Sequence, residues 1–299
     1  MARSEPGLAP SQSAHPSQAA HPGPVDDPYS GRAARALGYL PRPVRNLIME
    51  VGGITALLMT ILGSAIRRPT GYWRSVLFES YLALRRASLP ATLAIGGFLL
   101  FVAVMVITSL RVVGGESMYA PIVTQFAAQT FTIWINAIVV TGVIGAGITA
   151  DIGARKVREE IDAMEIMGVD PIRELAIPRV LSVALIMTLW SVPSLFVTMV
   201  FAQLGGLYVG GISDGYFYYD IFRNFGAIDI FALVVNSFLM GTLIGVVCCY
   251  KGLVAEGGSM GLGRAVNQAV VMSFVGVWVM QLAYQSLVLG LFPSIGAFR

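Results

Sequence analysis

The densest group of charged side chains lies in residues 155–174, with the sequence RKVREEIDAMEIMGVDPIRE. This stretch holds ten of the charged residues of a 299-residue chain that has 20 Lys and Arg and 17 Asp and Glu. Ile161, Met164, Ile166 and Met167 recur at near-helical spacing with carboxylates between them, which predicts one apolar and one acidic face. Such a helix can transmit a movement from a soluble partner protein to the membrane helices. An ordinary solvated loop between two helices is the alternative reading of the pattern.

The residues after this amphipathic pattern indicate where the helix ends. Gly168 follows the last apolar positions, and glycine is the commonest residue just past a helix C-terminus. Asp170 and Pro171 then form a helix-start signal. We therefore predict a short helix over residues 155–168 that lies across the cytoplasmic mouth of a membrane protein.

The composition indicates an integral membrane protein that is all α-helical. Hydrophobic residues make up 56% of the chain and charged residues 12%, against about 25% charged in soluble domains. A membrane-spanning helix needs about 20 apolar residues. Five stretches meet this need, and we predict spans at residues 89–110, 125–150, 180–204, 230–250 and 268–291. The sequence has no basic run with interleaved aromatic residues, which is the pattern that would indicate nucleic-acid binding.

The segment before these spans divides into two parts. Residues 1–40 are rich in Pro, Ala and Ser, which predicts a disordered cytoplasmic tail that precedes a membrane domain at residues 41–299. Within residues 42–87, the uncharged run at 51–66 is short for a span and has Arg residues on both sides. We predict amphipathic helices along the inner leaflet there, with a full span at residues 47–66 as the alternative.

The distribution of basic residues predicts the orientation. All Lys and Arg except Arg111, Arg223 and Arg299 fall on one side of the five predicted spans. The positive-inside rule places that side in the cytoplasm. We therefore predict a multi-pass protein of the bacterial inner (plasma) membrane, with its N-terminus and residues 155–174 cytoplasmic and its C-terminus extracytoplasmic.

Motifs for catalysis and nucleotide binding are absent from the sequence. There is no GxxxxGK[ST], HExxH or GxSxG, and the run GGSMGLG at residues 257–263 lacks the lysine of a phosphate loop. Both histidines lie in the N-terminal tail, and the adjacent Cys248 and Cys249 are predicted to be small packing residues. We predict no enzyme activity, catalytic residue, metal site or cofactor in this chain.

The second predicted span is rich in small residues and amides. Gly142, Ala146 and Ala150 recur at four-residue spacing, which is typical of close helix packing. Buried amides in lipid need a partner or a wet cavity. Three amides of this span are therefore candidates for lining a substrate path: Gln125, Gln129 and Asn136.

Two segments resemble the MlaE/YrbE family of lipid-transporter permeases. They are GAGITADIGARKVREEIDAMEIMGVDPIRELAIPRVL at residues 145–181 and CYKGLVAEGGSMGLGRAVNQAVVMS at residues 249–273. The resemblance implies the membrane subunit of an ABC transporter that moves lipids between membranes. The excess of Arg over Lys and the tail composition favour the actinobacterial Mce type.

The resemblance also implies partners and site residues. The partners are a separate ATPase that binds ATP and Mg²⁺, a second permease chain, identical or different, and MCE-domain proteins on the extracytoplasmic side. Asn236 stands where the family often has a lysine, and it joins the candidate substrate path. The positions that match the ATPase-coupling helix are Glu160, Asp162, Ala163, Met164, Glu165, Gly168, Val169, Asp170 and Pro171.

The predicted function is therefore an ABC-type lipid permease whose energy comes from another subunit. A non-transporting membrane scaffold is one alternative. An ion-coupled carrier is the other, and it would need acidic residues or inverted repeats within the membrane. The identity of the lipid, such as a fatty acid, sterol or phospholipid, and the direction of movement stay open.

Overall fold

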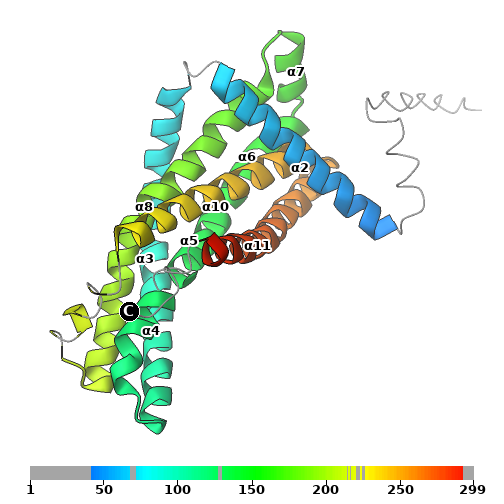
Figure 1. The fold of residues 1–299 in the computed structure, drawn as a ribbon. Helices are drawn as coiled ribbons and strands as arrows, with labels where there is room; N and C mark the ends of the chain where they lie inside the picture. The colour runs from blue at the N-terminus through cyan, green and yellow to red at the C-terminus, as the bar shows by residue number, and fades with distance from the viewer. Residues whose placement is uncertain are drawn as a thin grey trace, which may run out of the picture. The chain divides into compact units, whose positions relative to one another are not determined.

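The computed structural model describes residues 42–67, 72–126, 130–213, 215, 217–219, 223 and 226–291. The predicted tail at residues 1–40 lies outside these residues. Contacts divide the chain into two units, Met1–Glu50 and Val51–Arg299. Helix α2 (Arg42–Arg67) begins in the first unit and continues in the second, which contains all the later elements. Every regular element in the described ranges is helical, which confirms the all-α prediction (Figure 1).

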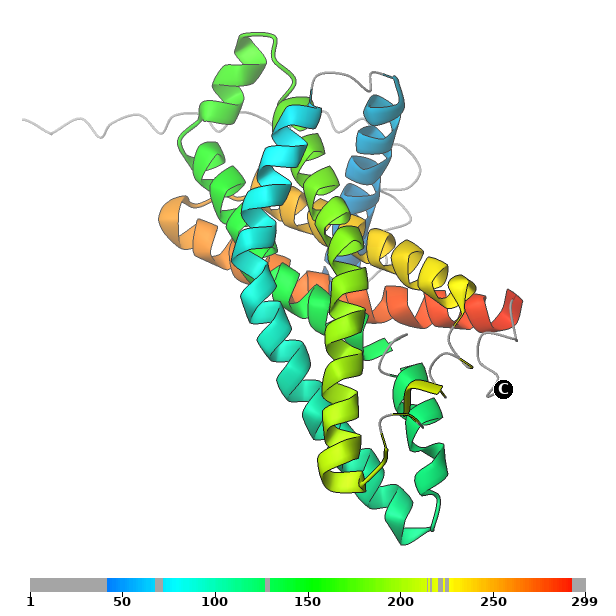
Figure 2. The same cartoon turned by 90° about the vertical axis from the view of Figure 1, so that its left-hand side faces the viewer.

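The second unit is built from long helices joined by short turns. In chain order they are α3 (Trp73–Val112), η1 (Glu116–Met118), α4 (Tyr119–Phe126), α5 (Thr132–Val140), η3 (Thr141–Gly145), α6 (Ala146–Val157), α7 (Glu160–Ile166), η4 (Ile172–Ala176), α8 (Ile177–Gly205), η5 (Gly206–Gly210), α10 (Ala227–Leu253) and α11 (Gly258–Leu291). Helix α8 packs against both α3 and α10, and α10 also packs against α6 and α11. Figure 2 shows α3 and α8 running side by side, with α7 beyond one end of them.

Six helical segments in the described part of the chain are long and apolar enough to cross a membrane. Five of them contain most of each predicted span, and the sixth is Leu47–Ser64 of α2. The segment that overlaps the predicted span at 125–150 is Thr132–Val157, and the bounds of that span stay a prediction. The segment of α2 is therefore long and apolar enough to cross the membrane. The five-span count and the interfacial placement of residues 42–87 stay predictions.

Helix α3 is longer than predicted. The sequence suggested an amphipathic piece before a span at residues 89–110, but Trp73–Val112 is one helix of 40 residues with Pro90 inside it. At 1.5 Å per residue it is about 60 Å long, whereas the hydrocarbon core of a bilayer is about 30 Å thick. One end of α3 therefore extends beyond the hydrocarbon. Good helix formers before Pro90 explain why the helix does not break there.

Glycines bring α8 and α10 close together. A Cβ atom at Gly241 would lie 2.7 Å from Ala184 Cα, and one at Gly245 would lie 2.9 Å from Val180 Cα. Small-residue packing is only partly confirmed in η3 and α6. Gly145 meets Cys248 of α10, but a Cβ at Gly142 would have no atom within 4 Å. Cys248 and Cys249 are fully buried free thiols, as predicted for packing residues.

Candidate functional site

The charged stretch forms two helices rather than the single helix predicted over residues 155–168. Helix α6 continues through Arg155 and ends at Val157, and α7 begins at Glu160. Glu159 lies between them with φ 60°, in the left-handed region that L-residues other than glycine rarely adopt. The prediction was wrong because no glycine or proline marks this break in the sequence.

The C-terminal end of α7 agrees with the sequence. Gly168 has φ 77°, its N–H donates to Glu165 O, and the N–H of Val169 donates to Met164 O. These two bonds form a Schellman motif, which confirms Gly168 as the stop. The carboxylate of Asp170 then accepts from the N–H of Ile172 at 3.0 Å, so Asp170 caps the next helical segment.

We predicted that the four apolar residues of this stretch share one face of a helix. The structure shows that they do not. Ile161 is buried in the core and Met164 packs partly against that core. Ile166 and Met167 instead point to solvent, with 88% and 70% of their surface exposed. Residues five apart on a helix lie about 140° apart, which separates Ile166 from Ile161. The result is an α7 that is anchored on one side and presents two large apolar side chains on the other.

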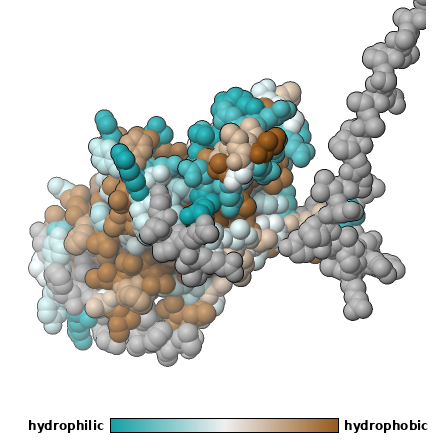
Figure 3. All heavy atoms as spheres, turned by 90° about the horizontal axis from the view of Figure 1, so that it is seen from above, coloured by the Kyte–Doolittle hydropathy of each residue, from teal (hydrophilic) through white to brown (hydrophobic). Residues whose placement is uncertain are grey.

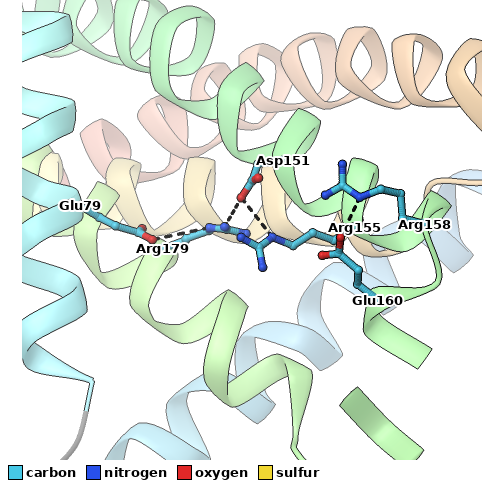
Figure 4. Close-up of polar contacts among 6 residues, drawn as sticks. All are labelled: Glu79, Asp151, Arg155, Arg158, Glu160 and Arg179. Atoms are coloured by element: carbon cyan, nitrogen blue, oxygen red, sulfur yellow. Dashed lines mark hydrogen bonds and ion pairs between the residues drawn. The ribbon is translucent and has the colours of Figure 1, made fainter. Parts of the chain in front are cut away.

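Ion pairs connect α6 and α7 across the Glu159 break. Lys156 Nζ lies 2.6 Å from the Asp162 carboxylate. Arg158 Nε lies 2.7 Å from the Glu160 carboxylate, and Figure 4 shows this second pair. These pairs are solvent-exposed, so each contributes little to stability by itself. They orient four of the charges of the stretch and leave the carboxylate of Glu165 exposed beside Ile166.

A second cluster of charges ties three helices together next to this segment. Arg179 of α8 is buried, and its guanidinium contacts Asp151 of α6 and lies 3.8 Å from Glu79 of α3 (Figure 4). Asp151 also pairs with Arg155 at 3.5 Å. Sequence reasoning missed this cluster because its members are up to 100 residues apart. The available signal was a lone charge at the end of each apolar run, since such charges need partners.

The end of the molecule that carries α7 is mixed in polarity. Seen from that end, hydrophilic atoms gather beside apolar patches (Figure 3). A cavity of about 370 Å³ also lies beside the Schellman turn. Its lining comes from the start of α3 and from the segment that follows α7, and includes Tyr72, Ser75, Val169, Arg173 and Pro178.

Two of the amides predicted to line a substrate path are buried, and each makes a hydrogen bond between two helices. Asn136 is buried and donates to Ser194 Oγ at 2.7 Å, which joins α5 to α8. Asn236 is buried and donates to Gln281 Oε1 at 3.0 Å, which joins α10 to α11. Gln125 lies half-buried on α4, and Gln129 lies outside the described residues. Each buried amide serves a helix–helix contact, and the substrate path through them stays a prediction.

The long apolar helices indicate a multi-pass membrane protein, and α7 is a short helix that exposes Ile166 and is followed by the exposed Met167. The chain belongs to the Permease MlaE family, which it matches over residues 77–287. Among its relatives, a probable ABC transporter permease protein of Rickettsia typhi is 28% identical over 75% of this chain and 86% of its own length.

Two further relatives match a shorter region. A probable ABC transporter permease protein of Synechocystis is 32% identical over 48% of this chain and 55% of its own length. Protein TRIGALACTOSYLDIACYLGLYCEROL 1, chloroplastic, of Arabidopsis thaliana is 32% identical over 48% of this chain and 41% of its own length. The chain thus matches about half the length of these two relatives. The MlaE part of the predicted resemblance is confirmed, and the actinobacterial type stays a prediction.

Proposed function

We propose that this chain is the membrane-spanning subunit of an ABC-type lipid transporter and that a separate ATPase supplies the energy. The observation that carries the proposal is the α7 segment, where Ile166 and Met167 are exposed at the end of a short helix that Ile161 anchors to the core. Family membership and the names of the relatives support the ABC class. The lipid name of the Arabidopsis relative supports the substrate class.

The chemistry of α7 suits docking on a soluble protein. Ile166 and Met167 would fill an apolar groove on the ATPase, because buried apolar anchors dominate interface energies. The exposed carboxylate of Glu165 would set the register by pairing with a basic residue. The neighbouring cavity of about 370 Å³ is large enough to receive a partner side chain. ATP and Mg²⁺ would bind to the partner ATPase rather than to this chain.

The anchoring of α7 would convert docking into movement of the membrane helices. Ile161 holds α7 to the core, and the Schellman turn at Gly168 and the Asp170 cap connect its far end to η4. A displacement of α7 would therefore move α6 and α8 together, because α7 is anchored between them. It would not be absorbed by a local change in a flexible loop. The proposal includes the predicted partners and orientation: a second permease chain, extracytoplasmic MCE-domain proteins, and α7 in the cytoplasm of a bacterial inner membrane.

The test is the coupling of ATP hydrolysis to lipid movement in the reconstituted complex. We expect Glu165→Lys and Gly168→Trp to lower lipid transport at least tenfold relative to ATP turnover, while each variant still inserts and assembles. Glu165→Lys reverses the docking charge, and Gly168→Trp puts a large side chain where φ is positive. The matched control is Glu256→Lys, an exposed carboxylate between α10 and α11.

Two results would contradict the proposal. If both α7 variants keep the wild-type ratio of lipid transport to ATP hydrolysis, α7 does not transmit movement from the ATPase to the membrane helices. Normal lipid movement in cells that contain only an uncoupled but assembled variant would favour the membrane scaffold.

A further inference from the structure

The cavity of about 370 Å³ beside the Schellman turn lies where the start of α3 meets the segment that follows α7. Its volume falls in the range of small-molecule sites, which is about 300 to 1,000 Å³. Tyr72 and Ser75 line it from the start of α3, and the rest of its lining is formed by residues 168–170, 173, 174 and 178. Because this lining begins one residue after the exposed Met167, the cavity continues the surface that is proposed to dock on the ATPase.

The charged side chains of this lining leave an excess of one negative charge. They are Asp170, Glu174 and Arg173, so two carboxylates face one guanidinium. Arg74 precedes Ser75 in the sequence, but it is not part of the lining. Arg173 and Glu174 make no ion pair with any residue that the structure describes. A group with a single positive charge would therefore balance the lining.

Glu174 is the carboxylate of this lining that is available to a partner. It is exposed, whereas the carboxylate of Asp170 already accepts from the N–H of Ile172 at 3.0 Å. An exposed carboxylate can accept two parallel N–H bonds from an arginine, and it can also pair with the point charge of a lysine. Tyr72 adds an aromatic residue to the lining, and aromatic faces attract cations. The charge, the aromatic residue and the volume all suit a long basic side chain.

We propose that this cavity receives a basic side chain, arginine or lysine, of the ATPase that docks on α7. Glu174 pairs with that side chain, and Arg173 opposes it. The inference rests on the proposed function and deepens it, because it names the chemistry by which the permease recognises its ATPase. Ile166 and Met167 supply apolar contact area that many partners could use, whereas a charge that must match its counterpart supplies selectivity. The contact also brings the start of α3 into the interface.

The test is the affinity of the transporter's own ATPase for the membrane subunits in nanodiscs. The purified ATPase is added back to nanodiscs that contain the full-length chain, and its dissociation constant is measured by biolayer interferometry. We expect Glu174→Gln to weaken binding about fivefold or more, because the bound cation loses its partner. Arg173→Gln should tighten binding, because it removes a like charge from the same cavity. The opposite signs of these two effects identify a cationic occupant.

Two outcomes of this measurement would overturn the assignment. Tighter binding by Glu174→Gln together with weaker binding by Arg173→Gln would show that the occupant is acidic. Wild-type affinity in both variants would show that no charged side chain enters the cavity.

Matched variants separate the cavity from the general charge of the surface. Arg74→Gln removes a positive charge next to the lining, and Glu256→Gln removes an exposed carboxylate between α10 and α11. We expect the affinity of both variants to stay close to that of the wild type. If Arg74→Gln tightens binding as much as Arg173→Gln does, the net charge of the surface controls docking, and the cavity assignment is wrong.

Photocrosslinking in the assembled complex locates the occupant. We expect Ser75→p-benzoylphenylalanine to crosslink to an ATPase peptide that contains arginine or lysine. The same replacement at Leu89, which is exposed farther along α3, should not crosslink to the ATPase. Crosslinks from position 75 only to lipid or to another membrane subunit would overturn the proposal.

These experiments separate the cavity from the coupling role of α7. Unchanged affinity in the cavity variants, together with uncoupling by Glu165→Lys and Gly168→Trp, would overturn the cavity assignment and support the proposed function. If the ATPase does not bind the wild-type membrane subunits, both the proposed function and the cavity assignment are wrong.

Discussion

Glu159 occupies the position where the backbone must leave α6 and enter α7. Its φ of 60° is unusual for a residue with a side chain, and the left-handed region costs an L-residue about 1–2 kcal/mol. The ion pairs of Arg158 with Glu160 and of Lys156 with Asp162 connect the two sides of this break. Strain at one residue and exposed ion pairs across it make the α6–α7 joint a defined corner.

Substitution of Glu159 should report that strain. We expect Glu159→Val to lower the free energy of unfolding by about 1–2 kcal/mol, since a β-branched side chain fits the left-handed region poorly. Glu159→Gly should be neutral or stabilising, because glycine adopts this conformation without a steric cost. Thermal unfolding of the purified protein measures both, with Glu165→Val as the exposed helical control. A Val variant as stable as the Gly variant would contradict the observed backbone.

Arg179 is the residue whose removal should affect the fold most directly. Its side chain is 9% exposed, while those of Asp151 and Glu79 are 49% and 36% exposed. Arg179→Gln would leave these carboxylates without their shared cation. Buried pairs lose about 3–5 kcal/mol when one partner is removed, and the partial exposure of the acids reduces our expectation to about 2 kcal/mol.

A second substitution separates the ion pairs from simple packing of Arg179. We expect Glu79→Gln to recover part of the stability lost in Arg179→Gln, because Glu79 loses its ion-pair partner in that variant whereas Asp151 keeps Arg155. Unfolding midpoints of the two single variants and the double variant measure the interaction. Strict additivity would show that Arg179 stabilises only through its aliphatic stem.

At the scale of the elements, Gly241 and Gly245 of α10 let its backbone approach the backbone of α8. We expect Gly241→Leu to separate them and to lower the folded yield severely, because even its Cβ would lie 2.7 Å from the backbone of Ala184. Gly63→Ala of α2 is the control, since a Cβ there meets nothing within 4 Å. Size-exclusion profiles measure folded yield. Equal yields would contradict the packing of α8 on α10.

Local chemistry made some elements predictable and left others hidden. The stop at Gly168 and the start at Asp170 follow from the residues themselves, and the structure confirms both. The break at Glu159 has no glycine or proline to mark it in the sequence. Arg179, Asp151 and Glu79 are adjacent only after three helices have packed together. Spacing along one helix therefore could not identify the cluster.

At the scale of the whole molecule, the open question is the path of α2 relative to the bilayer. Its segment Leu47–Ser64 is long and apolar enough to cross, yet Arg45 precedes it and more arginines follow it. A crossing would place basic residues on both sides, against the positive-inside rule. The predicted interfacial helix keeps Arg45 and Met167 of the coupling segment on the same, cytoplasmic side.

Cysteine labelling resolves this choice. We expect Arg45→Cys and Met167→Cys to react with a membrane-impermeant maleimide in inside-out vesicles and not in intact cells. Val113→Cys, an exposed position at the far end of α3, should show the opposite pattern. The native Cys248 and Cys249 are fully buried, so the wild-type background should be low. Labelling of Arg45→Cys only from outside the cell would establish α2 as a sixth crossing, and the N-terminus would then be extracytoplasmic.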